Sequence, residues 1–181
     1  MNILNYQITE QLYDSQNSLV YRAIKNENNQ PVILKILKED YPTPEELTRY
    51  RQEYDIMRRL NQLNLTGVVT AYHLEKYQNT LLICLEDFGG HSLKVELTKR
   101  AFALDELLAL AIQICDALGQ VHSQQIIHKD INPANLIWNA STGELKIIDF
   151  GISTQLSRQH LTLKNPNVLE GTLTYISPEQ T

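Results

Sequence analysis

The chain has 181 residues, of which 43% are hydrophobic and 20% are charged, and its formal net charge is −5. This length is enough for one domain of two lobes with a buried core. The acidic balance gives no basic face, which argues against nucleic acid as a partner. No stretch approaches the roughly 18 uninterrupted apolar residues of a membrane helix. The first residues also lack the basic and apolar regions of a signal peptide.

The two cysteines, Cys84 and Cys115, lie far apart and do not have the spacing of a metal site. Each lies in an apolar run. We therefore expect both to be buried free thiols in a reducing compartment, which predicts a cytoplasmic protein.

Three strands are predicted over residues 6–13, 18–24 and 31–37, with a polar turn between the first two. In the third strand, Ile33, Lys35 and Leu37 share one face. A lysine with apolar neighbours needs an anionic partner if it is buried, because an unpaired buried ammonium is costly. Taken alone, Lys35 is equally compatible with an edge lysine whose ammonium reaches water.

A helix is predicted to start after Thr43, with Thr43 as N-cap, Pro44 in the first position and Glu46 completing a capping box. Its apolar stripe consists of Leu47, Tyr50, Tyr54 and Met57. Glu53 lies within that stripe and should face the protein. Glu53 follows Lys35 by eighteen residues and is the candidate partner of its ammonium.

Two further strands are predicted over 68–75 and 80–86, joined by a turn at 76–79. The glycine pair at 89–90 then gives a flexible crossing. A long amphipathic helix is predicted over 104–122. Its expected core stripe consists of Leu107, Leu108, Ala111, Ile112, Cys115, Leu118 and Val121.

The stretch from 126 to 151 carries the chemically informative residues. Asp130 and Asn135 lie five apart on a polar loop, and Asp149 follows the apolar run 145–148. The intervening segment 139–144 is rich in turn residues and predicts a hairpin. A hairpin would bring the two loops together, so that three oxygen-bearing groups converge on a hard cation and a polyphosphate. Each of the three residues alone is well explained as a turn former or a strand cap, but this explanation accounts poorly for all three together.

The run His128-Lys129-Asp130-x-x-x-x-Asn135, followed by Asp149-Phe150-Gly151, resembles the catalytic and metal loops of eukaryotic-type protein kinases. The resemblance implies an α+β, bilobal fold. Residues 1–88 would form the N-lobe through the hinge, with a five-stranded antiparallel sheet and one helix (helix C). Residues 89–181 would form the first part of a helical C-lobe, whose remainder would lie beyond this chain.

The same resemblance implies roles for individual residues. Lys35 would bind the α- and β-phosphates of ATP, Glu53 would hold Lys35, and Asp130 would accept the proton of the substrate hydroxyl. Asn135 and Asp149 would hold Mg²⁺. Further contacts to ATP are expected from Val20, Leu85, Glu86, Asp87, Phe88 and Ile137.

The sequence departs from the family pattern at several places, and two of these departures bear on the ATP phosphates. The three glycines of the loop that covers the ATP phosphates fall here at Tyr13, Ser15 and Ser18. Asn132 stands where most serine/threonine kinases have a lysine that touches the γ-phosphate, which predicts slower transfer or compensation by another cation.

Residues 171–179 resemble the Gly-Thr-x-x-Tyr-x-x-Pro-Glu run of serine/threonine kinases, with Thr172 expected near Asp130. Several other segments are similar to a subgroup in which the kinase domain opens a very large bacterial signalling protein. In that subgroup an ATPase module, a GAF domain and a sensor histidine kinase follow, so further signalling domains are expected on the same chain.

The leading hypothesis is a serine/threonine protein kinase that uses ATP and Mg²⁺ and modifies protein hydroxyls in bacterial signal transduction. The alternative is a pseudokinase that docks a partner, motivated by the missing glycines and Asn132. A small-molecule phosphotransferase is disfavoured by residues 171–179. The 181 residues alone are expected to be inactive.

Overall fold

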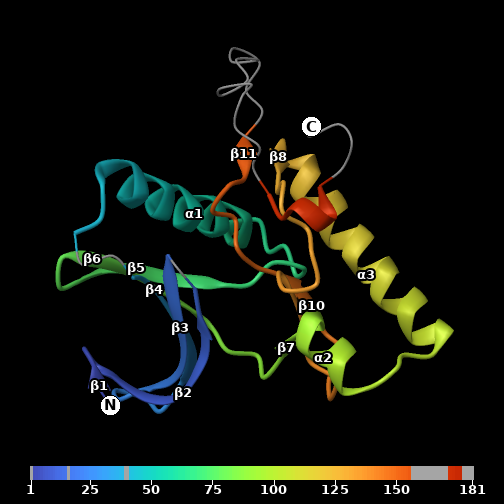
Figure 1. The fold of residues 1–181 in the computed structure, drawn as a ribbon, viewed down its shortest axis with the longest axis horizontal. Helices are drawn as coiled ribbons and strands as arrows, with labels where there is room; N and C mark the ends of the chain where they lie inside the picture. Colours follow the sequence, from blue (N-terminus) through green and yellow to red (C-terminus); the bar gives the residue numbers. More distant parts are fainter. Residues whose placement is uncertain (1, 16, 39–40, 156–170, 177–181) are drawn as a thin grey trace. The chain divides into compact units, whose positions relative to one another are not determined.

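A computed structural model describes residues 2–15, 17–38, 41–155 and 171–176 (Figure 1). The chain divides into two compact units. The N-terminal unit takes residues 1–61 and 69–88, and the C-terminal unit takes residues 62–68 and 89–181. Within the described residues, no helix combines the length and the apolar character needed to cross a bilayer.

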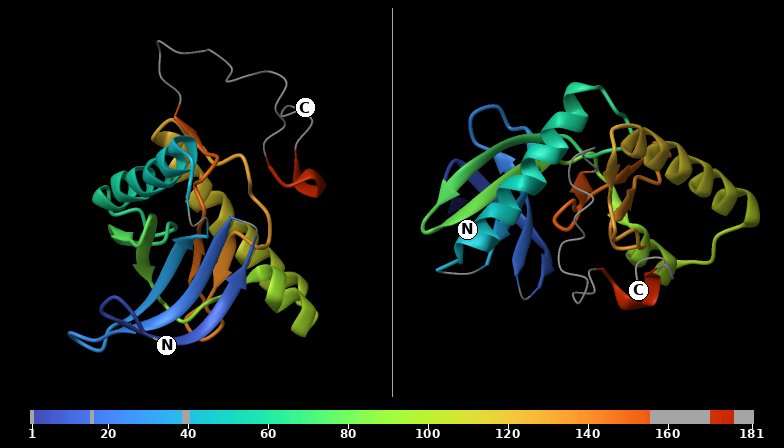
Figure 2. Two further views of the ribbon diagram at one scale, coloured as in Figure 1. Left: turned by 60° about the vertical axis from the view of Figure 1, so that its left-hand side comes forward. Right: turned by 90° about the horizontal axis from the view of Figure 1, so that it is seen from above.

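The N-terminal unit is built on an antiparallel sheet with the strand order β1-β2-β3-β4-β6-β5. Five long strands confirm the predicted sheet, and a two-residue edge strand joins them (Figure 2). The strands are β1 (Asn2–Ile3), β2 (Tyr6–Asp14), β3 (Ser18–Lys25), β4 (Pro31–Leu37), β5 (Ala71–Tyr77) and β6 (Thr80–Glu86).

Both boundaries of β5 differ from the prediction. β5 begins at Ala71, and the hairpin to β6 turns over Gln78 and Asn79 alone. The backbone of Gln78 has φ 53°, the positive φ that a two-residue hairpin turn requires. Val68 lies outside this sheet and instead forms a parallel bridge to Ile147.

One face of the sheet forms the core of the unit, because alternate residues of each strand point to the same side. The buried cluster consists of Ile3, Tyr6, Tyr21, Ala23, Val32, Leu34, Ile36, Leu82 and Cys84. Cys84 is buried as predicted, and burial raises the pKa of its thiol to about 11. The Tyr6 hydroxyl lies 2.7 Å from Nε2 of His73 and donates to Glu75 at 3.1 Å.

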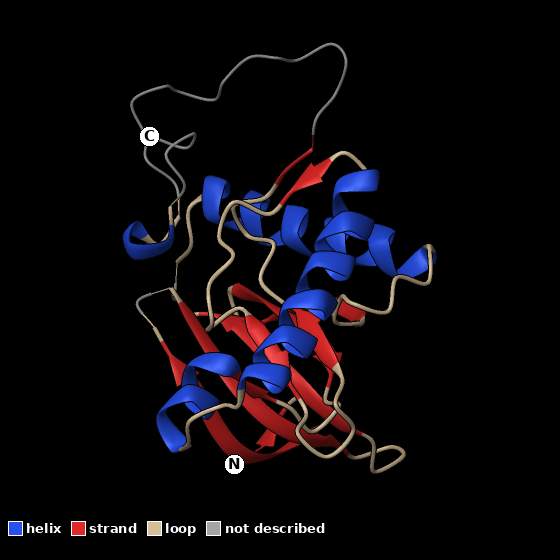
Figure 3. Ribbon diagram, turned by 90° about the vertical axis from the view of Figure 1, so that its right-hand side faces the viewer, coloured by secondary structure: helices blue, strands red, loops and turns tan. Residues whose placement is uncertain are grey.

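Helix α1 (Pro44–Gln62) lies along the sheet (Figure 3). The predicted capping box is confirmed. The backbone N–H of Thr43 donates to Glu46 Oε2 at 2.8 Å, and that of Glu46 donates to Thr43 Oγ1 at 3.2 Å. At the other end of the helix, the amide of Asn61 bonds to the backbone of Val69 and Ala71. Both ends of α1 are therefore fixed by side-chain hydrogen bonds.

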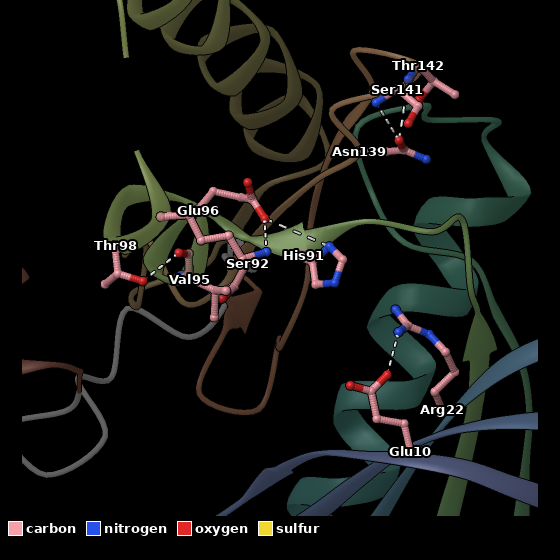
Figure 4. Close-up of polar contacts among 11 residues, drawn as sticks. Glu10, Arg22, His91, Ser92, Val95, Glu96, Thr98, Asn139, Ser141 and Thr142 are labelled. Carbon is pink, nitrogen blue, oxygen red and sulfur yellow. Dashed lines mark hydrogen bonds and ion pairs between the residues drawn. The ribbon is translucent and has the colours of Figure 1, made fainter. Parts of the chain in front are cut away.

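The C-terminal unit contains two small sheets and two helices. Strands β7 (His91–Ser92), β9 (Leu136–Trp138) and β10 (Leu145–Ile147) form one sheet, and β8 (Ile126–Ile127) pairs with β11 (Thr154–Gln155). The helices are α2 (Leu93–Lys99) and α3 (Leu104–Ser123), with a short 3-10 turn η1 (Leu173–Tyr175). In α2, the N-cap Ser92 accepts from the backbone of Val95 (Figure 4).

The predicted hairpin is confirmed as β9 and β10, which pair antiparallel. Its turn is held by Asn139, whose side-chain oxygen accepts from the backbone N–H groups of Ser141 and Thr142 (Figure 4). The strand ends at Ile147, one residue earlier than predicted.

The predicted core stripe of α3 is largely wrong. The residues of this helix that are buried are Leu110, Ala117 and Val121. Most of the predicted stripe is exposed, namely Leu107, Leu108, Ala111, Ile112 and Cys115. The helix packs closely against the rest of its unit at Ala117, where a Cβ added to Gly67 would overlap the alanine side chain. Apolar spacing identified a broad apolar face but not the part of it that is covered.

Candidate functional site

In the N-terminal unit, the predicted pair of Lys35 and Glu53 is formed. The ammonium Nζ of Lys35 on β4 lies 2.6 Å from Oε1 of Glu53 on α1. The exposed fractions of the two side chains are 12% and 3%. The Lys35 ammonium also lies 5.7 Å from the ring centre of Tyr50, within cation–π range. Lys35 is thus a largely buried cation fixed from the neighbouring helix.

Val20 on β3 pairs directly with Lys35 in the register of the sheet, and Ile83 on β6 pairs with Lys35 from the other side. The structure therefore places Val20 beside the lysine, on the strand that follows the β2–β3 turn.

The segment after β6 is fixed through Asp87. Arg22 on β3 donates from Nε to Asp87 Oδ2 at 2.7 Å and from Nη1 to Glu10 Oε2 at 2.8 Å (Figure 4 shows the second pair). The side chain of Asp87 is 7% exposed. Leu85 is buried and pairs with Ile33. Arg22 engages the Asp87 carboxylate. A ligand bound by this segment would therefore form its hydrogen bonds with main-chain groups.

The turn between β2 and β3 is closed by serine hydroxyls. Ser15 Oγ lies 3.1 Å from Ser18 Oγ and accepts from the Ser18 backbone N–H at 2.9 Å. Lys38 Nζ donates to Asp14 Oδ1 at 2.6 Å and to the Ser15 carbonyl at 3.2 Å. Hydrogen bonds from serine hydroxyls and from the Lys38 ammonium thus hold this turn. In the eukaryotic-type kinases that the sequence resembles, the corresponding turn contains glycines.

In the C-terminal unit, the loop between β8 and β9 carries Asp130. Its Oδ2 accepts from Asn135 Nδ2 at 2.9 Å. Its Oδ1 accepts from both the backbone N–H and the hydroxyl of Thr172, at 2.8 and 2.7 Å. The structure therefore brings together Asp130, Asn135 and Thr172. The expected proximity of Thr172 to Asp130 is confirmed.

His128 anchors this loop. It is 1% exposed and lies edge-on to Phe150, with ring centres 4.8 Å apart. Its Nε2 lies 2.9 Å from the carbonyl of Ile148, and its Nδ1 accepts from the Asp130 backbone N–H at 3.3 Å. A carbonyl can only accept, so these bonds fix the tautomer with the proton on Nε2. Both ring nitrogens are engaged by the backbone of the chain, so His128 serves as a structural residue of this loop.

Asp149 follows β10 on a loop with an unusual backbone. Its φ is 63° and its Oδ1 accepts from the Gly151 backbone N–H at 3.3 Å. Lys129, before Asp130, also has a positive φ of 70°. Such conformations in non-glycine residues cluster at functional loops. The backbone bond from Ile148 to Asn135, 3.0 Å, places the Asp149 loop beside the Asp130 loop.

Asn135 and Asp149 offer oxygen ligands of the kind that hard divalent cations prefer. Both hydrogen bonds of Asn135 to Asp130 use Nδ2, so its Oδ1 is directed away from Asp130. Among the described residues, no three His, Cys, Asp or Glu side chains gather as a metal site by themselves. The donor set fits a cation whose remaining ligands come from phosphate or water.

Ile137 lies on β9 between Leu136 and Trp138 and pairs with Ser92 and Lys146.

The folds of the two units and the two clusters of polar residues define a protein kinase domain. The family model described as the protein kinase domain matches residues 6–181. The chain therefore belongs to the protein kinase family. Membership implies ATP and a divalent metal ion in general terms.

Curated relatives include serine/threonine-protein kinase PrkC of Bacillus subtilis, 32% identical over 177 residues that cover 97% of this chain and 26% of that protein. The probable serine/threonine-protein kinase PknB of Lactococcus lactis is 32% identical over 151 residues, which cover 82% of this chain and 23% of that protein. The chain thus spans about a quarter of the length of these relatives.

Sequence reasoning missed three features of the site. The ion pair of Arg22 with Asp87 joins residues 65 apart, and no local pattern signals such a pair. The serine closure of the β2–β3 turn was visible only as missing glycines. The contacts of Asn132 were also missed, because its position was compared with a lysine and not read as an amide.

Proposed function

We propose that the protein is a serine/threonine protein kinase that transfers the γ-phosphate of ATP to protein hydroxyls. The observation that carries the proposal is the Asp130 carboxylate, whose Oδ1 accepts a hydrogen bond from the Thr172 hydroxyl at 2.7 Å. An aliphatic hydroxyl at this distance has the geometry that a serine or threonine acceptor needs for proton transfer. The names of the relatives support the choice of serine and threonine over tyrosine.

In the proposed reaction, the acceptor oxygen forms a bond to the γ-phosphorus while the bond from that phosphorus to the leaving oxygen of ADP breaks. Asp130 takes the hydroxyl proton. Lys35, oriented by Glu53, binds the α- and β-phosphates, and Asn135 with Asp149 holds the metal, which we propose is Mg²⁺. The cation would neutralise charge on the phosphate oxygens.

The remaining nucleotide contacts are proposed for Val20, Leu85, Glu86, Asp87, Phe88 and Ile137. We assign residues 1–88 to the N-lobe with the hinge and residues 89–181 to the C-lobe. Further signalling domains on the same chain, and a role in cytoplasmic bacterial signal transduction, complete the proposal.

A docking module without phosphoryl transfer is the second candidate. The turn at Ser15 and Ser18, closed by its own hydroxyls, favours it, because hydroxyls engaged with each other are less able to bind phosphate. The intact pair of Lys35 and Glu53 favours the kinase.

The test is transfer of labelled phosphate from Mg-ATP to the full-length protein itself and to a serine-rich protein. Asp130→Asn keeps the shape of the side chain and removes the proton acceptor, so we expect a loss of about 1,000-fold or more. The exposed Asp116 on α3 provides the matched control, and Asp116→Asn should leave transfer unchanged. Equal labelling of the wild type and Asp130→Asn would refute the kinase and favour the docking module.

A further inference from the structure

Asn132 is a buried amide in the Asp130 loop, and its side chain forms hydrogen bonds with three groups of the protein. It is 7% exposed. Its Nδ2 donates to the Asp130 carbonyl at 3.2 Å and to Thr172 Oγ1 at 3.3 Å, and its Oδ1 accepts from the Ala134 backbone N–H at 2.9 Å. A side-chain amide has two N–H groups, and both are used here.

The orientation of this amide follows from its partners. Rotated by half a turn, the Asn132 oxygen would face the Asp130 carbonyl and its NH₂ group would face the Ala134 N–H. Both contacts would then be repulsive, so the hydrogen-bond network selects the orientation observed. The amide therefore presents a donor to Thr172 Oγ1.

This donor and the Asp130 carboxylate together set the direction of the Thr172 hydroxyl. A hydroxyl has one proton and two lone pairs. Thr172 Oγ1 accepts from Asn132, and because a carboxylate oxygen accepts, the hydroxyl proton is directed to Asp130 Oδ1, 2.7 Å away. The result is a directional chain from Asn132 through Thr172 to Asp130, in which each bond polarises the next.

The segment that carries Thr172 is seated closely on the same loop. Gly171 has φ 125°, and a Cβ there would lie 3.0 Å from the Lys129 carbonyl. Thr172 also starts the η1 turn, with its carbonyl accepting from the Tyr175 backbone N–H at 2.8 Å. Asn132 is thus the buried polar side chain between the Asp130 loop and residues 171–176.

We infer that Asn132 is a positioning residue that ties residues 171–176 to the Asp130 loop and orients the Thr172 hydroxyl toward Asp130. It does not act as a neutral replacement for a phosphate-binding cation. The inference rests on the proposed function, because it assigns Asp130 a role in transfer. It predicts that Asn132 affects the rate of phosphate transfer only through its contact with Thr172.

A double-mutant cycle on the full-length protein tests this. Asn132→Ala and Thr172→Val, which removes the hydroxyl at nearly constant shape, should each lower kcat by about tenfold, and the double variant should be no worse than the poorer single variant. The KM for ATP should change by less than about twofold. Losses that multiply, or a raised KM for ATP in Asn132→Ala alone, would overturn the inference.

One further measurement separates this inference from the kinase proposal. Hydrogen exchange at the Thr172 amide, which donates to Asp130, should accelerate in Asn132→Ala and in the isosteric Asn132→Asp, whether or not the wild type transfers phosphate. Asn139→Ala removes a half-buried asparagine from the β9–β10 turn of the same unit and should leave that amide unchanged. Unchanged exchange in both Asn132 variants would show that Asn132 does not hold the segment.

Discussion

At the scale of single residues, the ion pair of Lys35 and Glu53 has two distinct consequences. The carboxylate of Glu53 is almost fully buried, and its partner is a largely buried ammonium 2.6 Å away. Removing one charge of a buried pair leaves the other without compensation, which is more costly than the pair itself is stabilising. The pair should therefore matter for stability as well as for the proposed binding of phosphate.

We expect Glu53→Gln to lower the stability of the protein by about 3 kcal/mol. It should also lower kcat/KM for ATP by at least about tenfold, because Lys35 loses the group that orients it. Thermal unfolding and steady-state phosphate transfer measure the two effects. Glu45→Gln, at an exposed position in the first turn of the same helix, is the matched control. Similar losses in both variants would refute a special role for Glu53.

The sequence predicts this pair because two periodicities meet in it. Strand alternation places Lys35 on one face of β4, and helical spacing places Glu53 on the inward face of α1. Asp87 with Arg22 could not be predicted in the same way, since the register of β3 against the segment after β6 depends on the whole sheet. Local patterns specify the face of a residue but not its partner across the fold.

At the scale of elements, the start of α1 shows how far local sequence reaches. The reciprocal bonds of Thr43 and Glu46 are formed as predicted. The stripe of α3 was assigned to the wrong residues because its exposed face is as apolar as its buried one. Capping depends on neighbours in sequence, whereas burial depends on which surface the fold brings to the helix.

Thr43→Ala should destabilise the first turn of α1 by about 1 kcal/mol, because one backbone N–H loses its acceptor. Hydrogen exchange of the first-turn amides should be faster in this variant. Thr48→Ala in the same helix is the control, since the Thr48 hydroxyl only bonds back to the Pro44 carbonyl. Slower or equal exchange in Thr43→Ala would contradict the role of the capping box.

The sheet core makes stability depend on pH in the alkaline range. Burial raises the pKa of Cys84 from 9.0 to about 11 and also raises that of Tyr6. The folded state thus holds these protons more tightly than the unfolded state. The contribution of Cys84 is fully present below pH 9, the ordinary pKa of the thiol, and is lost as pH rises toward 11.

For Cys84 alone, the free energy of unfolding should fall by about 2–3 kcal/mol across this interval. Thermal unfolding of the full-length protein between these pH values measures the slope. In Cys84→Ala the slope should be shallower, whatever the absolute stability of the variant. An identical slope in the variant would show that the thiol is not the titrating group.

At the scale of the whole molecule, each unit contributes residues that the proposed reaction needs. Lys35 belongs to the N-terminal unit and Asp149 to the C-terminal unit. A nucleotide that depends on both residues should stabilise the whole protein.

The sequence predicted the long helices, the long strands and the motifs that they carry. Residues 156–170 and 177–181 lie outside the described structure, and with them Pro178 and Glu179 of the run 171–179 that resembles serine/threonine kinases.

Mg-ATP at about 100 times its dissociation constant should stabilise the full-length protein by about 2.7 kcal/mol, seen as a higher melting temperature. Chelation of the metal with EDTA should remove most of that shift. Lys35→Met and Asp149→Asn should each abolish it, whereas Lys76→Met, at an exposed position on β5, should preserve it. A shift that survives in Asp149→Asn would refute the proposed metal ligand.

The close approach of α3 to Gly67 restricts how this sequence can diverge. A methyl group at position 67 would overlap both the Cβ and the backbone of Ala117. Any change at position 67 therefore requires α3 to move, and a larger residue at position 117 meets the same backbone from the other side. Backbone atoms cannot move aside as a flexible side chain does. Substitutions at positions 67 and 117 should therefore be rare in evolution, and a change at one position should accompany a change at the other. A homologue with a larger residue at either position should show a shifted α3.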